Sequence, residues 1–417
     1  MKKASIVSIG NEILSGQTVD TNTSYLSGKM FSIGVPVVSV RTVGDDIDFI
    51  VRALVSAIHD ADFILVTGGL GPTGDDLTRP ALAKKLDVEL QLQEEMLQQI
   101  NDFFDFRGLQ MPPANKVQAY IPAGAKAIKN NIGTAPGIMA QFKGRIIFAL
   151  PGVPSEMKQM FEEYVLPELK KVIVDSKQPA IAIRKLKCFG AGESTIARLI
   201  GDMMQRGRNP LINSTAVNGI VTLHIIATTE DKLRAEQMAG EDEKLLRNKL
   251  ADFVYGTAEQ SLAEVVGAKL AKLGKKVATA ESCTGGILAK LLTDVPGASR
   301  YFTYGWVTYS NQAKIQQLSV PADLLEKYGA VSEQIARAMA KGARKNSGAD
   351  FSIGITGIAG PAGGSEQKPV GLVYISVDSV TECEVKRLIF SYERQAMRLR
   401  TANTALNMLR LKIEKLT

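Results

Sequence analysis

Apolar runs alternate with helical periodicity along the first third of the chain. Mostly apolar runs predict strands at Ala4–Ile9, Val35–Val43 and Phe63–Thr67. Apolar residues at helical spacing predict helices near Thr21–Phe31 and Asp46–Ala57. Strands that alternate with helices of this length are typical of a parallel sheet with helices on both faces.

A predicted hairpin and helix complete this region. The two strands would be Gly137–Phe142 and Arg145–Leu150, joined by a turn at Lys143-Gly144. The helix would run from Pro154 to Lys171, with the proline in its first turn, where no helical hydrogen bond is lost. We therefore expect a first α/β domain at residues 1–172.

The middle of the chain, residues 178–257, has a different order of elements. We predict a strand, a short helix, a second strand and a long charged helix, at Ala180–Phe189, from Glu193, at Gly219–Thr229 and at Glu230–Leu250. This order loosely resembles a KH-type module, although no Gly-x-x-Gly loop stands between paired helices. The module is poor in candidate catalytic groups, so we expect it to connect or dimerise the flanking domains.

Alternation resumes from residue 258 and continues to residue 417. Helices are predicted at Gln260–Leu273, from Thr284 and from Arg394. Strands are predicted at Lys275–Ala280, Thr303–Tyr309, Phe351–Thr356, Val370–Val377 and Val385–Phe390. The fold class is therefore α/β: two α/β sandwich domains with mostly parallel sheets, joined by a small KH-like α+β module.

Composition narrows the class of protein. A chain of 417 residues is too long for one ordinary core, and its 45% hydrophobic and 22% charged residues are globular values. The formal net charge of +7 leaves nucleic acid open as a partner. However, Lys and Arg are dispersed among acidic residues, so we expect small phosphate-bearing molecules and not nucleic acid.

Cysteine usage and hydropathy predict the compartment. Cys188, Cys283 and Cys383 lie far apart without metal-type spacing, which is typical of a reducing environment. No apolar run approaches the roughly 18 residues of a membrane-spanning helix, and the sequence opens on a predicted strand without a signal peptide. We expect a cytoplasmic protein without membrane contacts.

A glycine-rich loop after the third predicted strand marks a first candidate site. Gly68–Asp76 has four glycines within seven residues, which lets backbone N–H groups approach a phosphate closely. Nearby acids supply the oxygen ligands that a divalent cation prefers. The predicted metal ligands are Glu12, Asp20, Asp75 and Asp76.

Other polar loops at element ends extend this site. The positions expected to contact a nucleotide are Asn22, Gly68, Gly69, Gly71, Thr73, Asn115, Lys116, Pro151 and Glu156. A turn with an aspartate helix cap would show the same glycine-rich pattern, so the loop alone does not separate the two interpretations.

A serine followed by glycines marks a second candidate site. Ser282 stands at a strand-to-helix turn, and the N–H groups freed by Gly285 and Gly286 could stabilise an oxyanion. The chain has only two histidines and none after His224, so this domain has no imidazole base. A lysine is then the best base, and Lys314 stands at the next strand-to-helix junction. To act as a base it needs a lowered pKa, through desolvation or a neighbouring cation.

Other interpretations of the second site stay open at the level of sequence. Ser282 could be a helix N-cap, and the neighbouring Cys283 competes as the nucleophile, although a free cysteine is usually a small buried residue.

A second glycine-rich run, Thr356–Ser365, could hold a phosphate. Its key positions are Gly357 and Gly360. Arg394 and Arg398 are four residues apart on one helix face and could contribute, although ordinary surface charge would explain them too.

These motifs together resemble the CinA family of competence/damage-inducible proteins. In the N-terminal part the resemblance rests on Gly10–Leu14, Asp20–Asn22, Thr67–Asp76 and Leu150–Met157. In the C-terminal part it rests on Thr279–Gly286, Val307–Lys314, Gly329–Ser332 and Thr356–Gly371. The matched motifs occur in order along the whole chain.

The resemblance implies a C-terminal amidohydrolase that converts nicotinamide mononucleotide (NMN) to nicotinate mononucleotide and ammonia. Ser282 would be the nucleophile and Lys314 its base, with Tyr309 and Thr356 assisting nearby. Arg394 or Arg398 would help to hold the phosphate. The family often has Gly-Asp before the arginine that aligns with Arg394, whereas Tyr392-Glu393 stand here, which weakens the assignment of Arg394.

The same resemblance implies an N-terminal domain of molybdopterin-binding-like fold that hydrolyses ADP-ribose. This reaction would use a divalent cation (Mg²⁺, Mn²⁺ or Co²⁺), with K⁺ as a second ion that could assist, whereas the C-terminal site would need no cofactor. Both reactions belong to salvage of pyridine nucleotides. We expect a homodimer, because symmetric dimers dominate among soluble oligomers.

Two other classes of function remain as alternatives. The N-terminal domain could bind a pterin in molybdenum cofactor assembly, but an amidohydrolase domain has no evident use there. The family name suggests an interaction protein for DNA uptake or recombination, which the dispersed basic residues do not favour.

Overall fold

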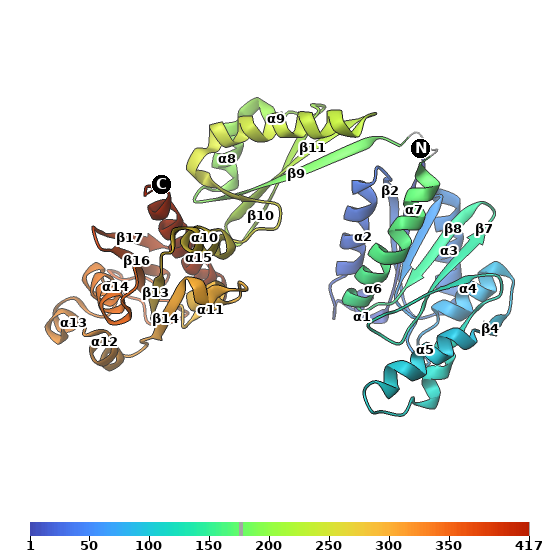
Figure 1. The fold of residues 1–417 in the computed structure, drawn as a ribbon, viewed down its shortest axis with the longest axis horizontal. Helices are drawn as coiled ribbons and strands as arrows, with labels where there is room; N and C mark the ends of the chain where they lie inside the picture. The colour runs from blue at the N-terminus through green and yellow to red at the C-terminus, as the bar shows by residue number, and fades with distance from the viewer. Residues whose placement is uncertain (175–177, 417) are drawn as a thin grey trace. The chain divides into compact units, whose positions relative to one another are not determined.

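The computed structural model describes residues 1–174 and 178–416, and contacts divide the chain into two compact units (Figure 1). The first unit comprises Met1–Ala182 with Thr228–Glu236. The second comprises Ile183–Ala227 with Gln237–Thr417, so it includes most of the middle module. Thr417, the end of the predicted C-terminal domain, lies outside the described residues.

A six-stranded sheet of order β2-β1-β3-β8-β7-β6 forms the centre of the first unit. The strands are β1 (Ala4–Ile9), β2 (Val37–Val43), β3 (Phe63–Thr67), β6 (Lys126–Ile128), β7 (Gly137–Phe142) and β8 (Arg145–Leu150). Strands β2, β1, β3 and β8 run parallel, whereas β7 pairs antiparallel with both β8 and β6. The predicted hairpin at Lys143-Gly144 is confirmed.

Both faces of this sheet are buried, which explains the nearly unbroken apolar runs of its strands. Ile6 of β1 and Leu65 of β3 pack in one core cluster, whereas Val7 and Val66 pack in another. The first cluster is covered by α2 (Thr21–Ser32) and by the helices that follow β8; the second is covered by α3 (Ile47–Asp60) and α4 (Thr78–Leu86).

The helix expected at Pro154–Lys171 is interrupted. It consists of α6 (Pro154–Met160), a π-turn (Phe161–Val165) and α7 (Leu166–Ile173). Pro167 stands in the first turn of α7, where it cannot donate to the preceding turn, and the wider π-turn accommodates that loss. The remaining elements of this unit are α1 (Asn11–Leu14), β4 (Leu90–Leu92), α5 (Glu94–Asp105), a 3₁₀ helix (Pro113–Ala119) and β5 (Tyr120–Pro122).

The middle module contains a four-stranded sheet of order β10-β11-β9-β12. Its elements are β9 (Ala180–Phe189), α8 (Glu193–Ile200), a 3₁₀ helix (Gly201–Met204), β10 (Leu211–Val217), β11 (Ile220–Thr229), α9 (Lys232–Leu250), a 3₁₀ helix (Ala251–Phe253) and β12 (Val254–Thr257). Strand β10 was not predicted, because its polar centre lacks an apolar run. The Asn218-Gly219 turn, with both residues at positive φ, is the hairpin signal that could have found it.

The C-terminal domain contains a five-stranded sheet of order β14-β13-β15-β16-β17. Its strands are β13 (Val277–Glu281), β14 (Phe302–Val307), β15 (Phe351–Gly357), β16 (Leu372–Ser379) and β17 (Cys383–Ile389). Strand β13 pairs parallel with β14 and β15, and the last two pairings are antiparallel. The carboxyl ends of β13, β14 and β15 therefore share one edge, which is where the serine and lysine loops begin.

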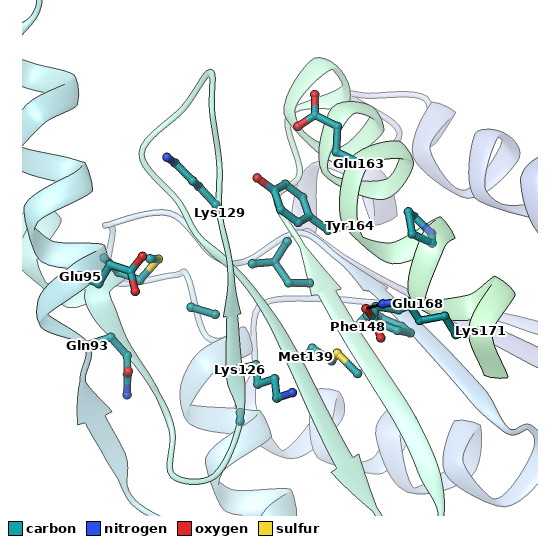
Figure 2. Close-up of a pocket in the computed structure, with 15 residues that line it drawn as sticks. Gln93, Glu95, Lys126, Lys129, Met139, Phe148, Glu163, Tyr164, Glu168 and Lys171 are labelled. Carbon is teal, nitrogen blue, oxygen red and sulfur yellow. Dashed lines mark hydrogen bonds and ion pairs between the residues drawn. The ribbon is translucent and has the colours of Figure 1, made fainter.

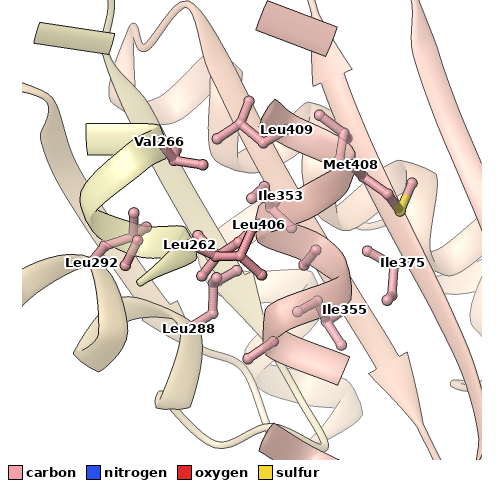
Figure 3. Close-up of a cluster of buried hydrophobic side chains, with 14 of the residues drawn as sticks. Leu262, Val266, Leu288, Leu292, Ile353, Ile355, Ile375, Leu406, Met408 and Leu409 are labelled. Atoms are coloured by element: carbon pink, nitrogen blue, oxygen red, sulfur yellow. The ribbon is translucent and has the colours of Figure 1, made fainter. Parts of the chain in front are cut away.

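Helices cover both faces of this sheet and give it two cores. They are α10 (Leu262–Leu273), α11 (Ile287–Thr293), α12 (Asn311–Leu318), α13 (Ala322–Tyr328), α14 (Glu333–Ser347) and α15 (Arg394–Glu414), with a 3₁₀ helix at Ala298–Arg300. Leu406 of α15 packs against Leu262 and Leu288 over the sheet residue Ile355 (Figure 3). The opposite core includes Leu318 and Met339. Within the described residues no helix is long and apolar enough to cross a membrane.

Candidate active sites

The serine turn begins directly after β13. Ser282 is 8% exposed, and its N–H donates to the Ile355 carbonyl at 3.0 Å. Its own carbonyl accepts from Gly285 N–H at 3.1 Å, which closes the turn before α11 begins. The side chain of Ser282 does not act as a helix N-cap, because α11 has Gly286 at that position without a side-chain cap. Its hydroxyl is therefore free for another role.

Lys314 of α12 contacts that hydroxyl. Its Nζ lies 3.2 Å from Ser282 Oγ and donates to the Thr308 carbonyl at 2.8 Å. The side chain is 1% exposed, and burial lowers the pKa of Lys314 below its usual 10.5 because the charged form is desolvated. The structure thus brings together the two residues that the sequence suggested, with the amine shifted toward the neutral form that can accept a proton.

Cys283 is a weak competitor for the role of nucleophile. It is buried, and burial raises the pKa of its thiol to about 12. The reactive thiolate is therefore scarce near neutral pH. The geometry favours Ser282, which has the Lys314 amine beside it.

The expected oxyanion donors already have partners. Gly285 N–H donates to the Ser282 carbonyl, and Gly286 N–H donates to Glu281 Oε2 at 3.1 Å. Both glycines have left-handed φ values, 59° and 92°, so they are required by the turn itself. In this conformation these two N–H groups do not point freely into the site, because the turn uses them internally.

Glu281 is a site residue that sequence reasoning missed. Its side chain is fully buried beside the serine turn, and its carboxylate accepts hydrogen bonds from three backbone N–H groups. An acid at the end of a fully buried strand, directly before a serine, was the signal that could have found it. Such an acid has no place in a buried strand unless the following turn supplies donors.

The other predicted residues of this site border it in different ways. Thr356 is buried at the end of β15 and donates its hydroxyl to the Ala330 carbonyl at 2.7 Å. Tyr309 contacts Lys314 Nζ through its carbonyl at 3.3 Å, while its ring is 65% exposed. Gly357 packs so closely that an added Cβ would lie 3.1 Å from Cys283 Sγ.

The two arginines join α15 to the two loops. Arg394 donates to the Gly360 carbonyl and Arg398 to the Thr284 carbonyl, each at 2.6 Å. The two arginine side chains therefore contact the loops that follow β15 and β13, although Arg394 itself is exposed and Arg398 is half-buried. An added Cβ at Gly285 would lie 2.8 Å from Arg398 Nη2, so this glycine makes room for the guanidinium.

In the first unit the glycine-rich loop folds back on the end of β3. A Cβ at Gly68 would lie 2.1 Å from the Ile9 carbonyl oxygen, and one at Gly69 would lie 2.4 Å from Thr78 Oγ1. Gly71 N–H and Thr73 N–H both donate to the Asp76 carboxylate, at 2.7 and 2.8 Å. The loop is therefore held by its own aspartate.

A pocket of about 400 Å³ opens beside this loop. Predicted residues that line it are Glu12, Gly68, Gly69, Gly71, Thr73, Asp75, Asp76, Pro151 and Glu156. Asp45 and Gln118 also line it and were not predicted. Burial raises the pKa of Glu156, although its carboxylate accepts from Asn130 Nδ2 at 2.7 Å.

Other predicted residues lie outside the lining of that pocket. Asp20 caps α2 by accepting from Thr23 N–H at 2.8 Å, and Asn22 Nδ2 donates to the Gly152 carbonyl at 2.8 Å; both line a small adjoining cavity with Glu12. Asn115 is buried in the 3₁₀ helix, donating to Gln118 Oε1 at 2.8 Å, and Lys116 is exposed.

The four acids expected to hold a metal do not form a preassembled cluster. Among residues 1–174 and 178–416, no three His, Cys, Asp or Glu side chains are placed to hold a metal ion together. Asp76 and Asp20 are occupied by the backbone groups that they bind. Glu12 and Asp75 are both exposed at the pocket.

A larger cavity of about 650 Å³ lies elsewhere in the first unit, over the sheet between α5 and α7 (Figure 2). It contains none of the predicted site residues. Its floor includes Met139 and Phe148, and its rim includes Lys126. Lys171 at the rim is paired with Glu168 at 2.6 Å.

Comparison with protein families defines the class to which this architecture belongs. Residues 5–171 match the family described as a probable molybdopterin binding domain. Residues 183–256 match the damage-inducible protein CinA KH domain, and residues 259–413 match the CinA C-terminal domain. The chain is thus a three-part protein that combines these modules in this order.

Full-length relatives give the family. A competence-damage inducible relative from Caldicellulosiruptor bescii is 43% identical over 410 residues, 98% of this chain and 99% of its own. A CinA-like protein of Dictyoglomus thermophilum is 41% identical over 408 residues, 98% of each chain. The crystal structure of a competence/damage inducible protein from Agrobacterium tumefaciens is 42% identical, covering 37% of this chain and 93% of its own, with a TM-score of 0.36. The chain belongs to the CinA family.

Proposed function

We propose that the C-terminal domain is a serine–lysine amidohydrolase that deamidates NMN. The observation that carries this proposal is the 3.2 Å contact between Lys314 Nζ and Ser282 Oγ in buried surroundings. This distance is within reach for general-base catalysis, and burial favours the neutral amine that a base must be. The resemblance of the surrounding motifs to the CinA family supplies the substrate class.

The proposed reaction proceeds through an acyl-enzyme. Ser282 Oγ attacks the carboxamide carbon while neutral Lys314 accepts the hydroxyl proton. The C–N bond then breaks, and Lys314 returns the proton to the departing ammonia, leaving a nicotinoyl ester on Ser282. Water attacks this ester with Lys314 again as base, which releases nicotinate mononucleotide and restores the serine hydroxyl. In sum, the amide and one water give a carboxylate and ammonium.

Neighbouring groups would hold the nucleotide. Arg394 and Arg398 reach the rim of the site and carry a charge suited to a phosphate, so we assign them to the substrate phosphate. Gly357 and Gly360 lie on the adjoining glycine-rich loop, where backbone N–H groups could add to that contact.

A pair of variants tests the nucleophile. Ser282→Ala should lower ammonia release from NMN by at least about 10³-fold, because it removes the hydroxyl that lies 3.2 Å from Lys314 Nζ. Cys283→Ala is the matched control at the next position and should keep activity within about threefold, because its buried thiol stays protonated. Near-normal release by Ser282→Ala, or loss only in Cys283→Ala, would assign the nucleophile to the cysteine.

We propose further that the N-terminal pocket hydrolyses ADP-ribose to AMP and ribose 5-phosphate. The support is a pocket at the carboxyl ends of parallel strands, lined by a glycine-rich loop and by several carboxylates. A divalent cation bound there would neutralise the charge of the pyrophosphate oxygens.

The residues present fit a cation that keeps part of its water shell. Glu12 and Asp75 are exposed carboxylates on the same pocket, and Asp45 lines it with them. Mg²⁺-type ions are commonly held by one or two carboxylates together with water and substrate phosphates, so a preassembled cage is not required. Asp76 would act indirectly, by keeping Gly71 and Thr73 in place.

The pterin-binding alternative uses the same pocket but requires no turnover. It is distinguished by incubating the protein with ADP-ribose and Mg²⁺, Mn²⁺ or Co²⁺ and measuring AMP. Formation of AMP that stops on adding EDTA supports the hydrolase, whereas tight pterin binding without AMP formation would replace it.

A further inference from the structure

Glu281 places a carboxylate in the interior of the C-terminal domain, next to the proposed nucleophile. Its side chain is 0% exposed. The oxygens accept from Gly286 N–H at 3.1 Å, Leu288 N–H at 3.0 Å and Ala289 N–H at 2.8 Å. The side chain of the residue before the serine therefore holds backbone groups that lie five to eight positions further along the chain.

Burial of a carboxylate is costly unless its charge is met by donors. Here the donors are the first N–H groups of α11, which have no partner within the helix and carry a partial positive charge. The helix end and the acid thus satisfy one another. A neutral apolar residue would leave those N–H groups buried without an acceptor.

The main chain of Glu281 contacts the lysine side of the site. Its carbonyl accepts from Thr308 N–H at 2.9 Å. The Thr308 carbonyl in turn accepts from Lys314 Nζ at 2.8 Å. One residue is therefore connected to both members of the pair, through its side chain to the serine turn and through its carbonyl to the lysine.

We infer that Glu281 is a positioning residue that fixes the Ser282 hydroxyl relative to Lys314. This inference rests on the proposed serine–lysine function of the same site. Glu281 does not touch the reacting atoms; it holds Gly286 and the start of α11, and so limits the positions that the intervening turn can take. Arg398 restrains the same turn as a donor, whereas Glu281 is an acceptor: its guanidinium donates to the Thr284 carbonyl at 2.6 Å.

Glu281→Gln tests this with little change in shape. The amide keeps one acceptor oxygen, but its NH₂ group would face backbone donors, so at least one of the three hydrogen bonds is lost. We expect kcat for ammonia release to fall about 10- to 100-fold with KM within about twofold, since misplacement by about 1 Å can cost this much. A purely structural cap would lower the melting temperature without changing the kcat of the folded enzyme.

Asp378→Asn is the matched control. Asp378 is another buried carboxylate of this domain, and it accepts from Arg344 Nε at 2.6 Å. In the sheet, Asp378 of β16 lies opposite Ser352, near the start of β15. The serine turn lies at the other end of β15. This variant should lose stability but keep kcat. An equal fall in kcat in both variants would show that loss of a buried charge, and not positioning, explains the effect.

A second measurement does not depend on NMN. A small fluorophosphonate should label Ser282, and mass spectrometry of the labelled peptide gives its rate. We expect labelling of Glu281→Gln to be at least about tenfold slower than that of the wild type, on the same geometric ground. If Glu281→Gln does not fold, Glu281→Asp replaces it: the charge stays but reaches less far, and labelling should slow in the same direction.

The outcomes separate the inference from the proposed function. A wild type that is labelled but releases no ammonia would overturn the NMN assignment and leave positioning by Glu281 intact. Wild-type rates of labelling and ammonia release in folded Glu281→Gln or Glu281→Asp would overturn the positioning role and leave the amidohydrolase intact.

Discussion

Replacing Lys314 tests the chemistry of the buried pair most severely. Lys314→Met keeps an unbranched side chain of similar length but removes the amine that lies 3.2 Å from Ser282 Oγ. Lys314→Arg keeps a cation but cannot become neutral near physiological pH. Neither variant can accept the serine proton, so both should lose amidohydrolase activity for the same reason.

The expected size of the loss follows from the role of the group. A positioned general base contributes about 10²- to 10⁴-fold, which corresponds to roughly 3 to 5 kcal/mol in the activation barrier. The amine is enclosed and 1% exposed, so bulk water cannot easily replace it. We therefore expect losses toward the upper end of this range.

The pH profile of the wild type adds an independent check. The active form has neutral Lys314, so the rate should rise with pH as this lysine loses its proton. Because burial lowers the pKa of Lys314, the midpoint of this rise should lie below the usual 10.5 of a lysine.

The assay is the initial rate of ammonia release from NMN, measured between about pH 6 and pH 10 in roughly half-unit steps. One buffer system is used over the whole range. Circular dichroism of each variant checks that it is folded. Retention by Lys314→Met of more than about a tenth of the wild-type rate would refute the role of Lys314 as the base.

Three further predictions concern the cation, the phosphate and the core. Asp75→Asn should lower metal-dependent hydrolysis of ADP-ribose at least about tenfold and leave ammonia release unchanged; unaltered AMP formation would remove Asp75 from the ligands. Arg394→Ala should raise KM for NMN about 10- to 100-fold but change little with nicotinamide riboside, which lacks the phosphate; equal changes with both would contradict the assignment. Leu406→Ala, at a fully buried core position, should lower the free energy of unfolding of the C-terminal domain by about 2 to 5 kcal/mol. Fluorescence of Trp306, the single tryptophan, reports that transition in urea, and an unchanged midpoint would show that the cluster repacks.

Local patterns predicted most of the fold, because the central strands β1, β3 and β13 are fully buried. The runs Ala4–Ile9 and Phe63–Thr67 are strands with the predicted bounds. Strand β10 was not predicted, because its central residues are polar and mostly exposed, so it has no apolar run. The π-turn before α7 was also not predicted, because one extra residue in a helical turn hardly changes the spacing of apolar residues.

The site was less predictable, because its arrangement depends on contacts distant in sequence. Ser282 and Lys314 could be paired in advance, since each stands at a strand end and the domain has no histidine. The role of Glu281 depends on three N–H groups that only the folded turn presents together. Likewise, no local pattern shows that Asp76 binds its own loop, or that Asn115 and Lys116 lie outside the lining of the pocket.

The central claim is tested most directly by incubating EDTA-treated wild-type protein with NMN and measuring both ammonia and nicotinate mononucleotide. The account predicts equal amounts of the two products, at a rate that chelation does not change, because Ser282 and Lys314 perform the reaction between them. Absence of both products, or release that stops when metal is removed, would contradict it.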